Sequence, residues 1–142
     1  MDNHFIFLGT GGARFVVSRQ LRWTAGIWCH FEGKRILIDP GPGTLVRFFN
    51  EGINLNPEQL DAIIVTHRHL DHSADVNVMV ESMTRGTFNR RGAFYAPADA
   101  LNTVEPVIFS YLRESLERVE VLKEGGEYYI GDVRFSSPVR HI

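Results

Sequence analysis

Four of the six side chains at positions 67–72 can donate a lone pair to a metal ion. The run reads HRHLDH, so it contributes His67, His69, Asp71 and His72. If the chain is extended as far as the middle of the run, His67 and His69 project to the same side, because side chains alternate along a strand. Asp71 and His72 then fall in the first turn of a following helix and can point back toward the same volume. Imidazole nitrogens and carboxylate oxygens are ligands that divalent ions such as Zn²⁺ accept.

The alternative is that these residues have ordinary structural roles. A single histidine is usually a surface or core residue, and an acidic residue near the start of a helix usually interacts with the helix dipole. Neither role accounts for three histidines and an aspartate within six residues. Solvated loops favour Gly, Ser, Asn and Lys, and the start of a surface helix needs no histidine. The run therefore predicts a metal site.

The run lies where a strand should end and a helix should begin. A short apolar segment, residues 62–65, leads directly into it. After it, Val76, Met79, Val80 and Met83 recur at the spacing of an amphipathic helix. A strand followed by a helix places such a run at the edge of a sheet.

The rest of the chain predicts strands first and then strands mixed with helices. The expected strands are residues 5–8, 26–31, 35–38, 62–65, 93–96, 119–121, 128–130 and 133–135. This order suits an α+β fold, in which a mixed sheet is covered by outer helices.

Two further helices are expected from capping residues and apolar spacing. One runs from Thr44 to Glu51, and another begins at Pro106. Their expected inward-facing residues are Leu45, Val46, Phe48 and Phe49 in the first helix, and Ile108, Phe109, Leu112 and Leu116 in the second. Residues 13–25 lack such spacing and are expected to form a loop, and we expect Trp23, Trp28 and Cys29 to pack in the core.

Length and composition fit a single domain over residues 1–142. No apolar run approaches the roughly 20 residues of a membrane-spanning helix. A single cysteine excludes an internal disulfide framework, and the first residues lack the basic start of a secretion signal, so we expect a cytoplasmic protein. The net charge of −2 is not that of a basic nucleic-acid-binding domain, although a local basic site is compatible with it.

The HRHLDH run and the strand before it resemble the signature of the metallo-β-lactamase superfamily. The FLGTG segment at 7–11 resembles the first strand and turn of the ribonuclease Z and phosphodiesterase-like branch. The ILIDPG segment at 36–41 resembles the strand and Asp-bearing loop beneath the metal site, and PVRH at 138–141 resembles the third motif of the superfamily. The four segments occur in family order and cover almost the whole chain.

The resemblance implies how the ligands are shared between two metal ions. His67, His69 and His141 would hold one ion, while Asp71 and His72 would contribute to a second. Two Zn²⁺ ions are expected, although the same nitrogen and oxygen donors also accept Mn²⁺ or Fe.

Asp39 would support the site by orienting the ligand loop through hydrogen bonds. Its residue type alone is equally well explained by the Pro-Gly turn that follows it. The family context therefore decides between the two interpretations.

The implied activity is that of a metal-dependent hydrolase that uses a metal-activated water. A bound divalent ion lowers the pKa of water toward neutrality, and Asp71 is the candidate for general acid–base catalysis. The expected substrate is a phosphodiester, either a small molecule or a nucleic acid. Arg14, Arg19 and Arg22 are candidate phosphate contacts, with ordinary surface charge as the alternative.

Members of the superfamily continue through a second half, which supplies a bridging Asp and a last His. We therefore expect this chain to be the N-terminal half of an αββα sandwich, incomplete at its C-terminus. A homo-oligomer, another chain that completes the fold, or a short protein with a degraded site are the alternatives. The absence of a long basic insertion between residues 85 and 92 argues against tRNA maturation.

Two other functions are compatible with the same sequence features. The chain could be an inactive or regulatory metal-binding half-domain. It could also be a diiron redox member of the superfamily, because nitrogen and oxygen donors hold iron as well as zinc.

Overall fold

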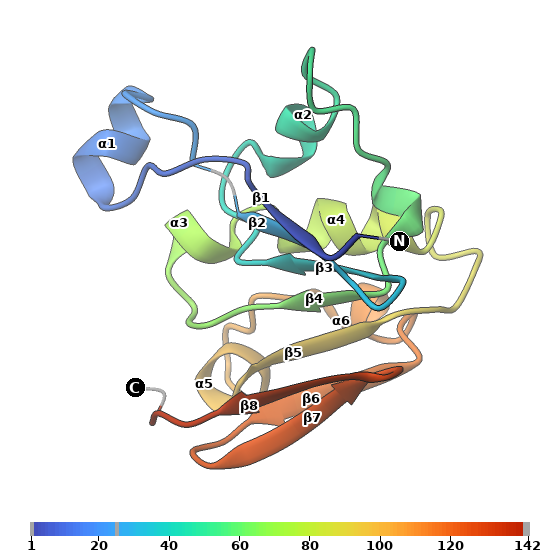
Figure 1. The fold of residues 1–142 in the computed structure, drawn as a ribbon. Helices are drawn as coiled ribbons and strands as arrows, with labels where there is room; N and C mark the ends of the chain where they lie inside the picture. The colour runs from blue at the N-terminus through green and yellow to red at the C-terminus, as the bar shows by residue number, and fades with distance from the viewer. Residues whose placement is uncertain (1, 25, 141–142) are drawn as a thin grey trace.

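The computed structural model describes residues 2–24 and 26–140, and its main feature is a six-stranded mixed sheet (Figure 1). The strands lie in chain order across this sheet: β1 (His4–Phe7), β2 (Ile27–Phe31), β3 (Lys34–Ile38), β4 (Ala62–Ile64), β5 (Ala93–Pro97) and β6 (Arg118–Leu122). The first three strands pair antiparallel, and β3 to β6 pair parallel. A separate antiparallel hairpin is formed by β7 (Gly126–Ile130) and β8 (Val133–Ser137).

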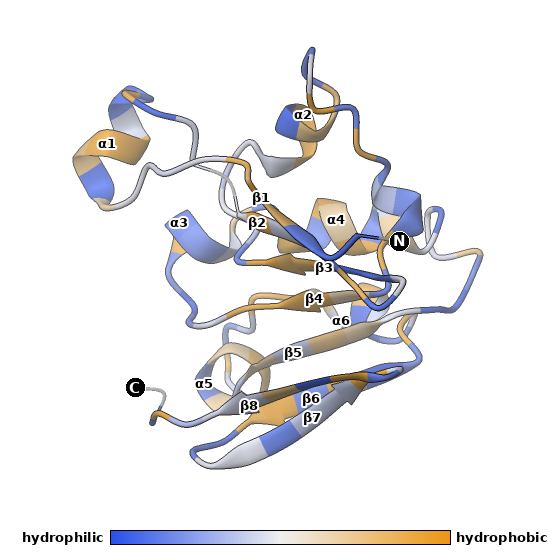
Figure 2. Ribbon diagram, in the orientation of Figure 1, coloured by the Kyte–Doolittle hydropathy of each residue, from blue (hydrophilic) through white to orange (hydrophobic). Residues whose placement is uncertain are grey.

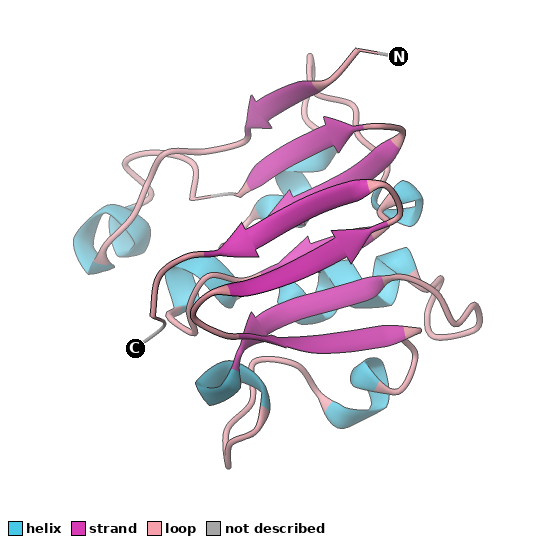
Figure 3. Cartoon of the chain, turned by 60° about the horizontal axis from the view of Figure 1, so that its bottom comes forward, coloured by secondary structure: helices cyan, strands magenta, loops and turns pink. Residues whose placement is uncertain are grey.

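Both faces of the central strands β3 to β5 are covered, and the covering differs between them. Most of the helices lie behind the strands in the view of Figure 3. Trp28, Leu37, Ile63 and Phe94 point toward this helical side and share a core with α4 (Val76–Met83). The adjacent residues along the same strands point the other way and pack against the β7–β8 hairpin, which contributes the buried Tyr128. Burial on both sides explains why β4 is hydrophobic throughout and β3 is hydrophobic over its last three residues (Figure 2).

The fold is that of a half-sandwich, as the sequence predicted. The mixed sheet carries helices on one face and the start of a second sheet on the other. The expected strands are all present, with boundaries that move by one or two residues. The β2–β3 hairpin turns at Glu32 and Gly33. Their φ angles of 47° and 75° are both positive, as in the type I′ turns that commonly connect two-residue hairpins.

The amphipathic helix after the HRHLDH run was predicted correctly. Its residues Val76, Met79, Val80 and Met83 have no exposed surface. The helix before it, α2 (Thr44–Phe48), is shorter than expected. Because the helix is so short, only one side of it packs on the sheet, through Leu45 and Phe48.

The inward orientation expected for Val46 and Phe49 is therefore wrong. Their side chains are 62% and 64% exposed. Thr44 is the first helical residue rather than the cap, and its Oγ1 donates a hydrogen bond to the carbonyl of Gly41.

Pro106 does not begin a helix. Two shorter helices, α5 (Ala98–Leu101) and α6 (Ser110–Arg113), flank an irregular segment that contains it. The Asn77 side chain holds this segment away from helical geometry, since it donates to the carbonyl of Val107 and accepts from the amide of Phe109. Phe109 is consequently exposed and stacks on Tyr111, whereas the other three expected core residues of this region are buried.

Residues 14–19 form a helix, α1 (Arg14–Arg19), where a loop was expected. The helix buries none of its residues, so its sequence carries no amphipathic pattern. Trp23, which follows it, is half-exposed, and the Arg47 guanidinium lies 5.1 Å from its ring centroid. The expectation of core packing was wrong for Trp23 and is confirmed for Trp28 and Cys29. Among the described residues, no helix has the length and apolar character needed to cross a membrane.

Cys29 provides a test of this packing. Its side chain is 3% exposed, and burial raises the pKa of its thiol to about 11 because the thiolate would lose hydration. At pH 8 about one molecule in a thousand would carry the reactive thiolate. We expect a disulfide reagent to label the folded protein at least roughly a hundredfold more slowly than the urea-unfolded protein. Equal labelling rates in the two states would contradict the burial of Cys29.

Candidate metal centre

The HRHLDH run crosses the sheet edge formed by the carboxyl ends of the parallel strands β3 and β4. β4 ends at Ile64, and the chain continues through two residues to His67. His69 then precedes the short helix α3 (Leu70–Ser73), which carries Asp71 and His72 in its first turn. The strand end and the helix start therefore place the polar side chains on one side of the loop, as the alternation predicted.

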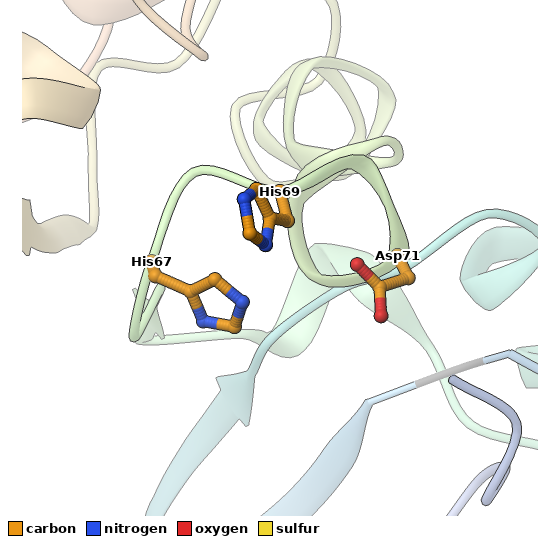
Figure 4. A group of neighbouring side chains, drawn as sticks. All are labelled: His67, His69 and Asp71. Carbon is orange, nitrogen blue, oxygen red and sulfur yellow. The ribbon is translucent and has the colours of Figure 1, made fainter. Parts of the chain in front are cut away.

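Three of these side chains converge (Figure 4). One donor atom from each of His67, His69 and Asp71 lies within 4.8 Å of the other two. His67 and Asp71 are half-buried, whereas His69 is exposed. Two imidazole nitrogens and a carboxylate oxygen at this separation fit a divalent ion with room for further ligands.

His72 lies beside this group. Its ring centroid is 4.1 Å from that of His67, and its Nε2 is 3.3 Å from Oδ2 of Asp71. Its other nitrogen, Nδ1, is 2.9 Å from Oδ2 of Asp39. Asp39 therefore sets the orientation of the His72 ring, and Nε2 faces the cluster.

Asp39 joins the end of β3 to the ligand loop. Its Oδ1 accepts the backbone N–H of Thr66 at 2.7 Å, and its Oδ2 accepts the hydroxyl of the same residue at 2.7 Å. Asp39 adopts a φ of 53°, an uncommon conformation for a residue other than glycine. Together with the bond to His72, these contacts hold both ends of the HRHLDH run against β3.

Asp71 is held from the opposite side by the first glycine turn. The amide of Ala13 donates a hydrogen bond to Oδ2 of Asp71 at 3.2 Å. A cleft beside His69 and Asp71 is also lined by Ala13, Arg14, Val17, Ser18 and Leu70. Ala13 and α1 therefore border the site, although they lie more than 50 residues earlier in the chain.

The three candidate arginines occupy different positions. Arg14 lines the cleft beside His69 and Asp71. Arg19 lies over the ring of Phe15, 5.8 Å from its centroid, and Arg22 is exposed. Arg14 is therefore the arginine of the three that the structure brings to the cleft.

His141, the remaining candidate ligand, lies outside the described residues. The rest of its motif, Pro138 to Arg140, follows β8 and is exposed.

The environment of His67 favours its neutral form. Burial lowers the pKa of His67, and repulsion from a charged His72 lowers it further, while Asp39 opposes the change. A neutral imidazole keeps a lone pair available, which a metal ligand requires.

Sequence reasoning missed two groups that contact the site. Thr66 bonds to Asp39, and its Oγ1 is also 3.0 Å from Nδ1 of His67. The sequence feature that could have revealed this contact is a hydroxyl-bearing residue directly before the HRHLDH run. The second group, the backbone amide of Ala13, has no side-chain signature that a sequence could reveal.

The sequence model of the Beta-lactamase superfamily domain matches residues 34–141. Together with the half-sandwich and the cluster at its sheet edge, this match identifies the class: the chain belongs to the metallo-β-lactamase superfamily.

Individual relatives place the chain within the ribonuclease Z-like branch. It is 36% identical over 128 residues to an uncharacterized protein of Methanocaldococcus jannaschii, covering 88% of this chain and 47% of that protein. It is 31% identical over 138 residues to ribonuclease Z of Methanopyrus kandleri, covering 94% of this chain and 45% of the enzyme. The crystal structure of a diphosphatase from the PhnP family superposes with a TM-score of 0.61 at 26% identity, covering 93% of this chain and 55% of that one. The chain thus spans about half the length of these proteins.

Gly41 tests whether the packing beneath the site controls its geometry. A Cβ at this position would collide with the backbone carbonyls of Asp71 and Thr24. We expect Gly41→Ala to displace α3 and weaken metal binding by at least roughly tenfold, although it removes no ligand. Isothermal titration with Zn²⁺ would measure this. Gly12→Ala is the matched control, because its Cβ would stand 3.6 Å from Oδ2 of Asp71, an ordinary contact. Equal affinities in the two variants would contradict the proposed packing constraint.

Substitution of the candidate ligands tests the site itself. We expect His69→Ala and Asp71→Asn each to lower bound metal sharply, as measured by elemental analysis after dialysis. The fold should persist, since His69 is exposed and Asp71 lies half-buried on the short helix α3, outside the hydrophobic core. His4→Ala, at an exposed histidine on β1, is the control for loss of a histidine elsewhere. Unchanged metal content in both site variants would show that the ligand assignment is wrong.

Proposed function

We propose that this chain provides the metal site of a metal-dependent hydrolase that acts on phosphodiesters. The observation that carries the proposal is the convergence of His67, His69 and Asp71, with His72 beside them, at the edge of a sheet in a chain of this superfamily. The proposal concerns the whole protein, because the chain spans about half the length of its relatives.

The ligand residues divide between two sites in this proposal. His67, His69 and His141 hold one ion, and Asp71 and His72 contribute to a second. When bound, such ions lower the pKa of water and neutralise charge that develops on a phosphoryl oxygen. Zn²⁺ is the proposed ion, since these donors form its common ligand set.

Asp71 is the residue that we assign to proton transfer. Its carboxylate accepts a hydrogen bond from the Ala13 amide and lies 3.3 Å from Nε2 of His72. These two contacts orient the carboxylate toward the site. A carboxylate held in this way can accept the proton of an attacking water. Asp39 has a different role in this proposal: it holds the His72 ring in place and does not contact the substrate.

A phosphodiester is the substrate class that the surroundings favour. Arg14 in the cleft offers a guanidinium, which pairs with phosphate oxygens through charge-assisted hydrogen bonds. Two of the similar proteins are named as a ribonuclease and a diphosphatase, activities that both break bonds to phosphorus. The remaining ligands of the second ion would come from a C-terminal half or from another copy of the chain.

The proposal predicts metal-dependent turnover of phosphodiesters by the protein as its gene encodes it. We expect hydrolysis of bis-p-nitrophenyl phosphate, or of nucleic-acid ends, that a chelator abolishes and Zn²⁺ or Mn²⁺ restores. Asp71→Asn should lower kcat by roughly 10²- to 10⁴-fold, as for loss of a general acid–base group.

The other outcomes each name a different function. Bound metal without turnover of either substrate would refute the hydrolase and favour a regulatory metal-binding domain. Bound iron with visible absorbance and no hydrolysis would favour the diiron redox alternative.

A further inference from the structure

A single carboxylate is linked to Nδ1 of two candidate ligands, directly for one of them and through a hydroxyl group for the other. Oδ2 of Asp39 lies 2.9 Å from Nδ1 of His72 and accepts the Thr66 hydroxyl at 2.7 Å. The same hydroxyl oxygen lies 3.0 Å from Nδ1 of His67. Asp39 therefore reaches His72 directly and His67 through Thr66.

The direction of these hydrogen bonds follows from the proton count. A carboxylate accepts but does not donate, so the one hydroxyl proton of Thr66 points to Asp39. Toward His67 the hydroxyl then presents a lone pair, and Nδ1 of His67 must supply the proton. The remaining nitrogen, Nε2, is left with its lone pair on the side of the cluster. His72 differs from His67, because a carboxylate faces each of its nitrogens: Asp39 lies 2.9 Å from Nδ1 and Asp71 lies 3.3 Å from Nε2, so the count fixes the tautomer of His67 alone.

We propose that Thr66 is a positioning residue, which fixes His67 in the tautomer protonated at Nδ1 and thereby selects Nε2 as its donor atom. In a free neutral imidazole the proton favours Nε2, so His67 needs a partner at Nδ1 to reverse this preference. The ligand role of His67 belongs to the proposed function, whereas its tautomer is a property of the metal-free chain. The two ideas can therefore fail separately.

The hydroxyl can be separated from the structural part of Thr66. The backbone N–H of Thr66 bonds to Oδ1 of Asp39 independently of the side chain, so Thr66→Val keeps the loop tied to β3. The residue is exposed, so the methyl group that replaces the hydroxyl needs no space in the core. Thr66→Ser retains the hydroxyl and serves as the rescue variant.

The matched control is Thr84→Val. Oγ1 of Thr84 is buried, donates to the carbonyl of Val80 at the end of α4 and accepts the backbone N–H of Thr87. This variant loses a threonine hydroxyl and its hydrogen bonds away from the HRHLDH run, so it reports the effect of such a loss on stability alone.

The first experiment is ¹H–¹⁵N correlation NMR of the histidine rings in the full, metal-free chain. The measurement belongs at pH 8, where the lowered pKa of His67 keeps the ring neutral. We expect His67 to be protonated at Nδ1 in the parent, in Thr66→Ser and in Thr84→Val. In Thr66→Val, His67 should shift to the Nε2–H form while His72 stays unchanged. Protonation of His67 at Nε2 in the parent, or an unchanged His67 in Thr66→Val, would overturn the inference.

The second experiment measures Zn²⁺ affinity by competition with a chromophoric chelator. Loss of a hydrogen-bond partner behind a metal-binding histidine typically weakens binding roughly 10- to 100-fold. We expect that loss in Thr66→Val and affinity within a few-fold of the parent in Thr66→Ser and Thr84→Val. Parent-like affinity in Thr66→Val would overturn the link between tautomer and metal binding. A parent that binds no Zn²⁺ but shows the expected tautomers would refute the proposed function and leave the positioning role intact.

Discussion

The hydrogen bonds of one carboxylate hold the candidate site together. Asp39 stands at the end of β3, and its two oxygens bind the backbone and the side chain of Thr66 and the ring of His72. The HRHLDH loop lies between β4 and α3. These bonds fix both ends of the loop to a rigid parallel strand pair, and the geometry of the polar cluster depends on them.

The position of Asp39 follows from the order of the strands. β3 and β4 are parallel neighbours, so their carboxyl ends meet at one edge of the sheet. The residue after one strand can then bond directly to the residues that follow the other. The left-handed backbone at Asp39 and the close approach of Gly41 to the Asp71 carbonyl let the chain turn away at once, which leaves room for α3. A longer or less tightly turned connection would separate the carboxylate from the loop that it orients.

Sequence alone predicted the parts of the molecule where local pattern and tertiary packing agree. The strands and the helix bearing Met79 are apolar because they are buried, so their periodicity was readable. The polar cluster was readable because its histidines and aspartate lie within six residues. Val46 and Phe49 were misplaced because α2 ends at Phe48 and packs only one side on the sheet. Phe109 was misplaced because its backbone amide donates a hydrogen bond to the side chain of distant Asn77, which outweighs local helical preference.

Contacts of other kinds leave little trace in a single sequence. The contact from Ala13 to Asp71 uses a backbone amide, which any residue type except proline supplies. The role of Thr66 depends on two partners from different segments of the chain.

The helix α1, which buries none of its residues, has a consequence for the cleft that it borders. Segments with few buried contacts open locally at low free energy, whereas helices packed on a core open only with global unfolding. Amide hydrogens in α1 should exchange with solvent long before those of α4. One wall of the cleft, which carries Arg14, is therefore pliable, and the opposite wall at His69 and Asp71 is anchored to the sheet. Molecules of different width can then reach the same polar atoms of His69 and Asp71.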